Sequence, residues 1–482
     1  YIYFSIKRYY SLPPGPFPLP IVGNILSFKG NHYYDDILRN WSKKYGPVFT
    51  FYILDKPLVI ITDPDMAKKA FQSKDFSGRM KTFTASIFIN YTSLLYTDYG
   101  PAWEALRRVA QSAAQKYSTN EELIIVAVNS VEKIVQTMLK TEGPDKPIEP
   151  FNYIYLMFLN ILANSAFGEN YDMDDPEFIF LKYILRDAYE ETQSNYFTRE
   201  LSPIIQLMDY KTTGKQRKLM GQTIDLMIRK FNKHYTDYNP DSDRDFCDAL
   251  ISAKNDRLRE GRESAKYLTD TNLAMTVFDL FFAGTDTSQQ TFQWLLLFLA
   301  YYPLIQQKLR QEIDDTIGDQ MPKHADRQRL HYTMAFISET LRYRNVAPYG
   351  LPHKAIVDCQ LGNYKIPKGQ TVVFYQSISL RNTDEKYWKN GLDFLPERFI
   401  DKDGRYQIAG HPAYTPFGVG RRNCLGEKLA IADLFLVLVC FLQSTRNYDI
   451  VLDDQQNGGI GLDTNLVEVS PNYYRIILKT KK

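Results

Sequence analysis

The stretch FGVGRRNCLG, residues 417–426, places Cys424 in a glycine-rich turn. An apolar segment expected to form a helix follows, beginning near Glu427 and ending near Phe441. Glycines permit positive φ angles and close approach of the backbone to a ligand. Amide groups at a helix N-terminus and the guanidinium of Arg422 stabilise negative charge on sulfur. The stretch therefore predicts a cysteine thiolate that binds a metal.

The spacing Phe-x-x-Gly-x-Arg-x-Cys-x-Gly in this loop resembles the signature of the cytochrome P-450 family. Its five positions are occupied by Phe417, Gly420, Arg422, Cys424 and Gly426. The resemblance implies that Cys424 is the axial ligand of a haem b iron, with Phe417 shielding it and Arg422 pairing with a haem propionate. Gly426 would belong to the same cofactor-binding loop. An ordinary buried thiol, the alternative, is our interpretation of the other cysteines: Cys247, Cys359 and Cys440.

A second motif lies in a segment, residues 269–300, that is expected to be one helix about 45 Å long. Its centre, AGTDT at 283–287, resembles the family motif Ala-Gly-x-Asp-Thr. The resemblance implies that Thr287 hydrogen-bonds the oxygen species at the iron, that Asp286 relays protons, and that two further residues border the cofactor: Ala283 and Gly284. Glycine and hydroxyl residues also weaken a helical ladder, which predicts a local opening for water. Alone, the motif also fits a helix with a surface acid.

A charged network is expected to support the cysteine loop. Glu339 and Arg342 have a spacing that allows contact on a helix, but Glu104 and Arg107 share it, so spacing alone is weak evidence. The family resemblance adds Arg398 and implies a structural Glu-Arg-Arg network. Removing Arg342 from such a buried network should cost about 3–5 kcal/mol or prevent haem incorporation.

Three further residues are candidates for propionate binding. Trp103 and Arg107 lie four residues apart on one helical face, so an indole and a guanidinium could both contact a carboxylate. The resemblance gives this pair to a haem propionate and adds His353, for which an ordinary loop histidine is the alternative. The sequence departs from the family at LRNT, residues 380–383, where many relatives have His-Arg-Asp.

The pattern along the chain predicts a mainly α fold with small β-sheets (α+β). Helical periodicity dominates residues 64–343, with breaks at several prolines, while strands are expected near both ends. The expected strands include 48–52, 58–61, a run within 366–376, and an edge strand at 473–478. The resemblance implies a single-domain cytochrome P-450 fold over residues 25–482, with haem between the long helix and the cysteine loop.

The N-terminal residues suggest a membrane link. Residues 1–11 are interpreted as the remaining part of an N-terminal membrane anchor, with a frayed soluble terminus as the alternative. Residues 12–24 are interpreted as a stiff proline-rich hinge. A spanning helix needs about 20 apolar residues, and no other stretch provides them. Basic residues after the anchor favour a cytosolic body. We therefore expect an endoplasmic reticulum membrane protein whose catalytic domain faces the cytosol.

Composition excludes several other classes. The 58 basic and 56 acidic residues nearly balance, so nucleic-acid binding has no support. The four cysteines show no C-x-x-C pair and no histidine at zinc-ligand spacing, which argues against a disulfide scaffold or a zinc site.

The chain carries no flavin or nicotinamide motif, so O2 chemistry would need electrons from another protein. The resemblance implies NADPH-cytochrome P-450 reductase, allows cytochrome b5 as a second donor, and suggests docking on basic residues: Arg108, Lys116, Arg421 and Lys428. The substrate would be a lipophilic small molecule in an apolar pocket. By family position this pocket would include Phe83, Ile87, Phe88, Phe278, Phe282, Val346 and Leu351, each of which could equally be a core residue.

Two other functions fit parts of this pattern. A haem-thiolate isomerase, dehydratase or peroxygenase would need no reductase, but the intact Asp286-Thr287 pair argues against it. A non-catalytic haem-binding or lipid-carrier protein on the same scaffold would show spectral shifts on ligand binding without forming product.

Overall fold

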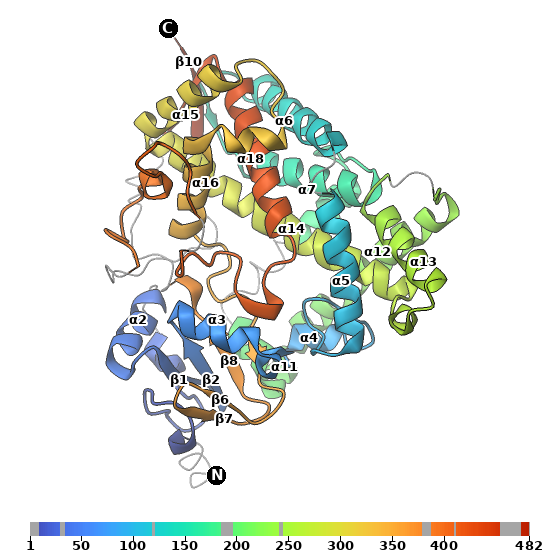
Figure 1. The fold of residues 1–482 in the computed structure, drawn as a ribbon, viewed down its shortest axis with the longest axis vertical. Helices are drawn as coiled ribbons and strands as arrows, with labels where there is room; N and C mark the ends of the chain where they lie inside the picture. The colour runs from blue at the N-terminus through green and yellow to red at the C-terminus, as the bar shows by residue number, and fades with distance from the viewer. Residues whose placement is uncertain are drawn as a thin grey trace.

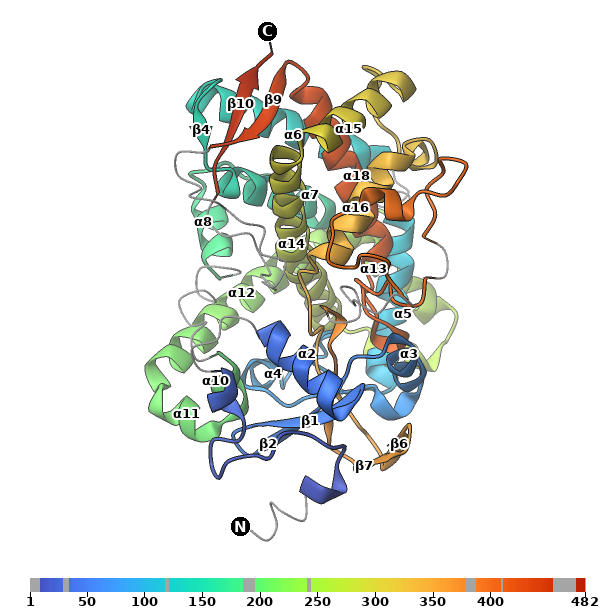
Figure 2. The ribbon, with the colours of Figure 1, turned by 90° about the vertical axis from the view of Figure 1, so that its left-hand side faces the viewer.

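The computed structural model describes residues 9–28, 34–117, 121–184, 196–240, 244–377, 387–408, 411–453 and 474–481. Helices make up most of the body, and small sheets lie at its two ends (Figures 1 and 2). This confirms the predicted mainly α class with small sheets. Residues 380–383 and residues 1–8 of the expected anchor lie outside the described residues.

Several helices begin where the sequence predicted breaks. A proline opens five of the described α-helices, because its fixed φ suits the first helical turn and its missing N–H is not needed there. The α-helices are α2 (Tyr34–Tyr45), α3 (Pro64–Gln72), α4 (Phe83–Ile87), α5 (Pro101–Tyr117), α6 (Glu121–Thr141), α7 (Phe151–Phe167), α8 (Pro176–Lys182), α10 (Tyr196–Leu201), α11 (Pro203–Met208), α12 (Tyr210–Thr236), α13 (Phe246–Arg259), α14 (Asp270–Tyr301), α15 (Pro303–Thr316), α16 (His331–Tyr343) and α18 (Glu427–Ser444).

Short 3-10 helices complete the helical set. They are η1 (Ile25–Phe28), η2 (Lys74–Phe76), η5 (Glu263–Tyr267), η6 (His324–Gln328), η7 (Pro396–Phe399) and η8 (Gly420–Arg422). The last of these lies within the cysteine loop.

The largest sheet has five strands in the order β1-β2-β8-β5-β3, in which only the β2–β8 pair is parallel. Its strands are β1 (Val48–Ile53), β2 (Lys56–Ile61), β3 (Gly78–Arg79), β5 (His353–Lys354) and β8 (Thr371–Phe374). A separate hairpin pairs two strands, β6 (Cys359–Leu361) and β7 (Tyr364–Ile366).

The third sheet corrects one prediction. It contains β4 (Pro147–Ile148), β9 (Tyr448–Leu452) and β10 (Ile476–Thr480). The predicted edge strand near the end of the chain is β10, which lies in the centre of the order β4-β10-β9. The edge assignment was wrong because β10 hydrogen-bonds to partners on both sides, Ile148 of β4 and Leu452 of β9 both facing Ile476.

The long helix α14 runs through the core and packs against α7, α12, α5 and α18 (Figure 2). Thr269 caps its N-terminus by accepting a hydrogen bond from the Asn272 N–H at 3.2 Å. The helix continues without interruption through 283–287, so the expected local opening is not seen. Instead, hydroxyl groups bond to carbonyls one turn back, as Thr285 does with Phe281 at 2.8 Å, and the ladder stays intact.

Candidate functional site

The cysteine loop is held against α3 by its glycines. Gly420 has φ +82°, and a Cβ at this position would lie 2.2 Å from the carbonyl oxygen of Phe71. Gly418 also has a positive φ, +74°. These positions require glycine because a side chain would be strained and, at Gly420, would collide with backbone. The turn is closed by the Cys424 N–H, which donates to the Phe417 carbonyl at 2.8 Å.

Cys424 is an exposed residue, yet protein atoms crowd its sulfur, and this desolvation raises the pKa of the thiol. A hydrogen bond from the Gly426 N–H and the charge of Arg107 act in the opposite direction. Arg107 lies beside the loop and donates to both the carbonyl and the side-chain oxygen of Asn423, each at 2.8 Å. The cation nearest the thiol is thus Arg107.

The guanidinium of Arg422, which was expected to stabilise the thiolate, makes its hydrogen bonds elsewhere. It donates to three main-chain carbonyls, those of Ser77 at 3.0 Å, Leu94 at 3.2 Å and Thr97 at 2.7 Å. It also lies 3.8 Å from the ring centre of Trp103, a cation–π contact.

A third arginine, Arg79, joins this region although the sequence did not indicate it. Arg79 is buried, and it pairs across the sheet with His353, opposite it in β5. Desolvation and the charges of Arg79 and Arg107 lower the pKa of Arg422 to about 8, and desolvation and Arg107 lower that of Arg79 to about 10. Cations that are buried close to one another in this way would be stabilised by an anion among them.

The other two propionate candidates also face this region. Trp103 donates its indole N–H to the Leu94 carbonyl at 3.0 Å. His353 stacks on Phe71 with ring centres 3.8 Å apart, and its Nδ1 lies 2.7 Å from the Phe76 carbonyl. Burial and the charges of Arg79 and Arg422 hold the pKa of His353 well below its usual range. A neutral ring that donates from Nδ1 presents only an acceptor at Nε2, so contact with a carboxylate requires a second proton.

The motif on α14 exposes one hydroxyl. Thr287 is exposed, whereas its helix neighbours Thr285 and Ser288 are buried. The Thr287 hydroxyl donates to the Ala283 carbonyl at 2.7 Å. This face of α14 therefore offers a polar group that a bound molecule could reach.

The acid and the glycine of the motif have separate contacts. The carboxylate of Asp286 accepts from the side-chain amides of Gln289 at 3.2 Å and Gln290 at 2.7 Å. A Cβ on Gly284 would lie 2.8 Å from a methyl group of Leu162, so this glycine allows α7 to approach α14 closely. The structure thus gives Gly284 a role in the packing of α7 against α14.

Part of the predicted pocket forms one aromatic cluster. Phe278 lies 5.6 Å from Phe88 and 5.7 Å from Phe282 between ring centres, and Phe88 stacks on Tyr96 at 4.9 Å. Ile87 packs against the same core. The structure thus brings three predicted aromatic residues together and adds Tyr96, which no motif indicated.

The remaining pocket candidates are more dispersed. Phe83 is buried, and the guanidinium of Arg217 lies 5.3 Å from its ring centre. Val346 packs at the border of the main core. Leu351 is 37% exposed, and its carbonyl accepts from Arg79 at 3.1 Å.

Asp279 is a buried acid that sequence reasoning missed. It accepts hydrogen bonds from the Ser93 hydroxyl, at 2.8 Å, and from the Leu94 N–H. Burial raises its pKa to about 7, although these hydrogen bonds act to lower it. A signal was present in the sequence, since Asp279 lies one helical turn before Ala283 on the same face of the helix.

The structure brings the predicted charged network together. The Arg342 guanidinium donates to both carboxylate oxygens of Glu339, at 2.6 and 2.8 Å, and both side chains have no exposed surface. Arg398 lies 3.4 Å from the same carboxylate. Arg342 also donates to the carbonyls of Gly391 at 2.7 Å and Asp393 at 2.9 Å. These contacts tie α16 and η7 to the segment that precedes the cysteine loop.

Comparisons with known proteins agree on one family. A family model described as Cytochrome P450 matches residues 13–462. Cytochrome P450 1A1 of Rattus norvegicus is 30% identical over 443 residues, which is 89% of this chain and 83% of the relative. Cytochrome P450 2A9 of Mesocricetus auratus is 32% identical over 454 residues, 90% of this chain and 87% of the relative. Cytochrome P450 1A1 of Chelon auratus is 31% identical, covering 91% of this chain and 85% of the relative.

Proposed function

Because the chain belongs to the cytochrome P450 family and is a haem-thiolate monooxygenase, we propose that it inserts one oxygen atom from O2 into a lipophilic small molecule, using electrons from an NADPH-dependent flavoprotein reductase. The observation that carries this proposal is the arginine cluster beside the cysteine loop. Burial disfavours the charged forms of Arg79 and Arg422, the charge of Arg107 adds to this effect on both, and the two carboxylates of haem b would supply the opposite charge.

Haem fits the residues present. Cys424 would hold the iron, the loop around Phe417 and Gly426 would border it, and Arg107, Arg422 and Trp103 would face the propionates. When bound, a haem with a thiolate ligand supplies O2 activation and cleavage of the O–O bond. The protein's own contribution is to position the substrate, exclude water and deliver protons.

Proton delivery is assigned to α14. Thr287 presents an exposed hydroxyl, which can exchange its bond with the Ala283 carbonyl for one to a bound molecule. Asp286 is one residue away, and its carboxylate is oriented by Gln289 and Gln290. The pair would pass a proton from the Asp286 side of the helix to its exposed face.

The substrate is proposed to be lipophilic because aromatic side chains make up the part of the cluster that is not buried. Phe282 and Tyr96 are partly exposed and stack on the buried Phe278 and Phe88, and aromatic rings favour flat apolar molecules. Asp279 lies next to this cluster but its oxygens are used by Ser93 and Leu94. Orientation of the substrate would therefore depend mainly on shape.

We assign the protein to the endoplasmic reticulum membrane with its catalytic body in the cytosol. Within the described ranges, none of the helices combines the length and apolar character that a bilayer span needs. Two segments near the β1–β2 end nevertheless expose apolar side chains, which a lipid surface would cover (Figure 2). They are Phe17, Leu19 and Ile21 in the first segment and Ile204, Leu207 and Met208 in and around α11.

The reductase is proposed to dock where exposed cations surround the cysteine loop. Arg108 on α5, Arg421 in the loop and Lys428 on α18 are exposed. The side chain of Lys116, the fourth candidate, lies outside the described residues. An acidic surface on the flavoprotein, or on cytochrome b5, would complement these charges.

Reconstitution with NADPH-cytochrome P450 reductase and a panel of lipophilic substrates tests the proposal. We expect hydroxylated product that depends on both O2 and NADPH. Product formed equally well with peroxide and no reductase would favour the peroxygenase alternative, and spectral shifts without product would favour a carrier.

The role of Thr287 has its own test. Thr287→Ala should divert most reducing equivalents to hydrogen peroxide, because the proton-delivering hydroxyl is lost. Thr285→Ala is the matched control, since Thr285 makes the same bond one turn back but is buried. Equal ratios of product to NADPH in both variants would contradict the assignment.

A further inference from the structure

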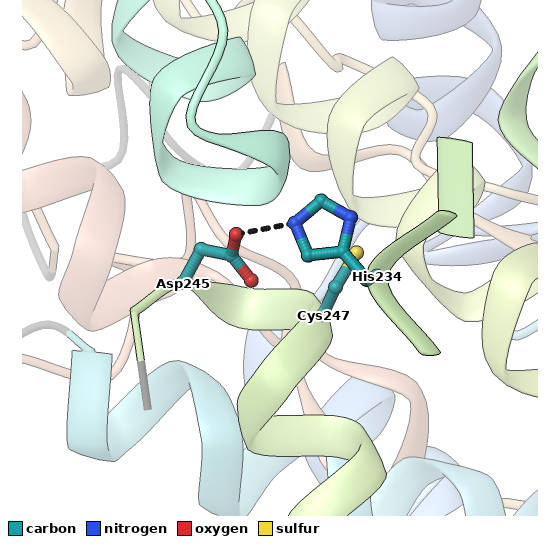
Figure 3. Close-up of side chains that lie close together, drawn as sticks. All are labelled: His234, Asp245 and Cys247. Atoms are coloured by element: carbon teal, nitrogen blue, oxygen red, sulfur yellow. Dashed lines mark hydrogen bonds and ion pairs between the residues drawn. The ribbon is translucent and has the colours of Figure 1, made fainter. Parts of the chain in front are cut away.

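Outside the haem site, the structure brings together three side chains that are not adjacent in sequence. His234 lies near the end of α12, Asp245 caps the N-terminus of α13, and Cys247 lies in the first turn of α13 (Figure 3). One potential ligand atom from each lies within 4.8 Å of the other two. The spacing of cysteines and histidines in the sequence argued against a zinc site. It did not indicate this group because the three side chains come from two separate helices.

The histidine faces two acceptors. Its Nδ1 lies 3.1 Å from the Lys230 carbonyl oxygen, and its Nε2 lies 2.6 Å from Asp245 Oδ2. A neutral imidazole has a single N–H, so it can donate to only one of these oxygens. With the proton on Nε2, the ring donates to Asp245. With the proton on Nδ1, the Nε2 lone pair faces the carboxylate, and a proton or a metal ion between them would join the two groups.

The hydrogen bond to the carbonyl also favours the metal-binding tautomer. Histidines that bind metals commonly donate their second ring N–H to a carbonyl or carboxylate, which fixes the ring orientation. Here the Lys230 carbonyl would hold Nδ1–H, leaving Nε2 free to coordinate.

The buried thiol completes the set. Cys247 has no exposed surface, and burial raises its pKa well above the usual value, with the charges of Asp245, Asp248 and Glu169 adding to this effect. Such a thiol is protonated and inert on its own, and direct metal coordination is what converts it to a thiolate.

The surrounding charges are compatible with a cation. Asp248 is paired with Arg244 at 2.7 Å, and Lys230 is occupied by Glu177 at 2.7 Å and by Glu169. The second carboxylate oxygen of Asp245 accepts the N–H of Asp248 at 3.0 Å. The carboxylate is thus oriented by the backbone and turned toward the histidine.

We propose that His234, Asp245 and Cys247 bind one zinc-class divalent cation that links the end of α12 to the start of α13. Imidazole, carboxylate and thiolate together suit zinc, whereas Mg2+ and Ca2+ prefer oxygen ligands alone. Zinc bond lengths of about 2.0–2.3 Å place neighbouring ligand atoms about 3.3–3.8 Å apart in a tetrahedron. Binding releases the proton on sulfur and the proton at Nε2, and water fills the fourth position through the 11% of the His234 side chain that is exposed.

The test uses the haem-loaded protein, in which iron gives an internal count of molecules. Protein is incubated with ZnCl2, dialysed against metal-free buffer, and analysed for zinc and iron by mass spectrometry. We expect about one zinc per iron, and X-ray absorption at the zinc edge should show one sulfur ligand at about 2.3 Å. Retention of no zinc would mean that the His234–Asp245 contact is only a hydrogen bond, and a spectrum without sulfur would place zinc elsewhere; either result overturns the proposal.

Variants locate the site. Cys247→Ala and His234→Gln should each lower retained zinc at least tenfold, while Cys440→Ala should retain the wild-type ratio. Cys440 is a suitable control because it is also a buried thiol with a raised pKa, about 12, on a different helix, α18. Unchanged zinc in Cys247→Ala would overturn the proposal. The visible spectrum of the reduced carbon monoxide complex is used to check that each variant is folded. If a variant does not fold, the X-ray absorption spectrum of the wild-type protein decides which ligands bind zinc.

Discussion

Replacing Arg342 with methionine should destabilise the protein strongly, because the substitution removes a cation from a fully buried pair. Glu339 has no exposed surface, so its carboxylate would lose its main partner without gaining access to water. Arg398 would be left as the nearest cation, at 3.4 Å, with its other donors bonded to the carbonyls of Lys389 and Asn390. The carbonyls of Gly391 and Asp393 would also lose a charged donor.

The expected cost is about 3–5 kcal/mol, the usual range for an uncompensated buried charge. A tenfold change in the unfolding equilibrium corresponds to about 1.4 kcal/mol, so this equilibrium should shift by roughly a hundred- to a few thousand-fold. The double variant Glu339→Gln/Arg342→Met should lose much less than the sum of the single changes, because neither residue of the pair leaves its partner's charge uncompensated and Arg398 keeps its bonds to the carbonyls of Lys389 and Asn390. The two residues should therefore show a coupling energy of about 1–3 kcal/mol.

The free energy of unfolding would be measured by urea titration of the haem-loaded protein, followed by far-UV circular dichroism and the Soret band. Arg259→Met is the matched control, because Arg259 pairs with Asp256 at the same helical spacing but both side chains are more than half exposed, at 77% and 53%. It should change stability by less than about 0.5 kcal/mol. A loss below about 1 kcal/mol for Arg342→Met, or strict additivity in the double variant, would refute the reasoning.

Two further predictions follow from the site. Gly420→Ala should lower the free energy of unfolding by about 4 kcal/mol or more and abolish most haem incorporation, because its Cβ would collide with Phe71. Gly404→Ala should cost only about 1–2 kcal/mol, because Gly404 has a similar positive φ of +76° but open space around it. Equal losses for the two variants in urea titrations would contradict the role of the collision. Burial raises the pKa of Asp279 to about 7, so the folded protein keeps a proton that the unfolded chain releases near pH 4. The free energy of unfolding should therefore fall by up to about 1.4 kcal/mol per pH unit between about pH 4 and 7, and stay constant above pH 7. The difference in unfolding free energy between wild type and Asp279→Asn should follow this slope, and a difference that does not vary with pH would contradict it.

Much of the fold could be predicted from sequence because its signals are local. Periodicity gave α14 nearly to the residue, since Thr269 caps it and the apolar run ends at Tyr301. Prolines marked helix starts for the same local reason. The edge assignment of β10 failed because strand order depends on partners distant in sequence, in this case Ile148 in β4. No pattern within residues 473–478 records that partner.

The candidate site divides in the same way. Motif spacing named Cys424, Thr287 and Glu339 because those residues lie in short, regular segments. Arg79 was missed because it acts through sheet pairing with His353 and through distance to other cations, which the sequence does not encode locally. The contacts of Arg422 could not be predicted for a related reason, since its partners are main-chain carbonyls rather than identifiable side chains.

One main-chain residue shows how these parts depend on one another. The Leu94 carbonyl accepts from both Trp103 and Arg422, while the Leu94 N–H donates to Asp279 on α14. A shift of this single peptide segment would therefore disturb Trp103, Arg422 and Asp279 together. Because the Leu94 side chain takes no part in these bonds, substitution at Leu94 leaves them in place. The connection between α14 and the cysteine loop can therefore be tested only through the three partner side chains.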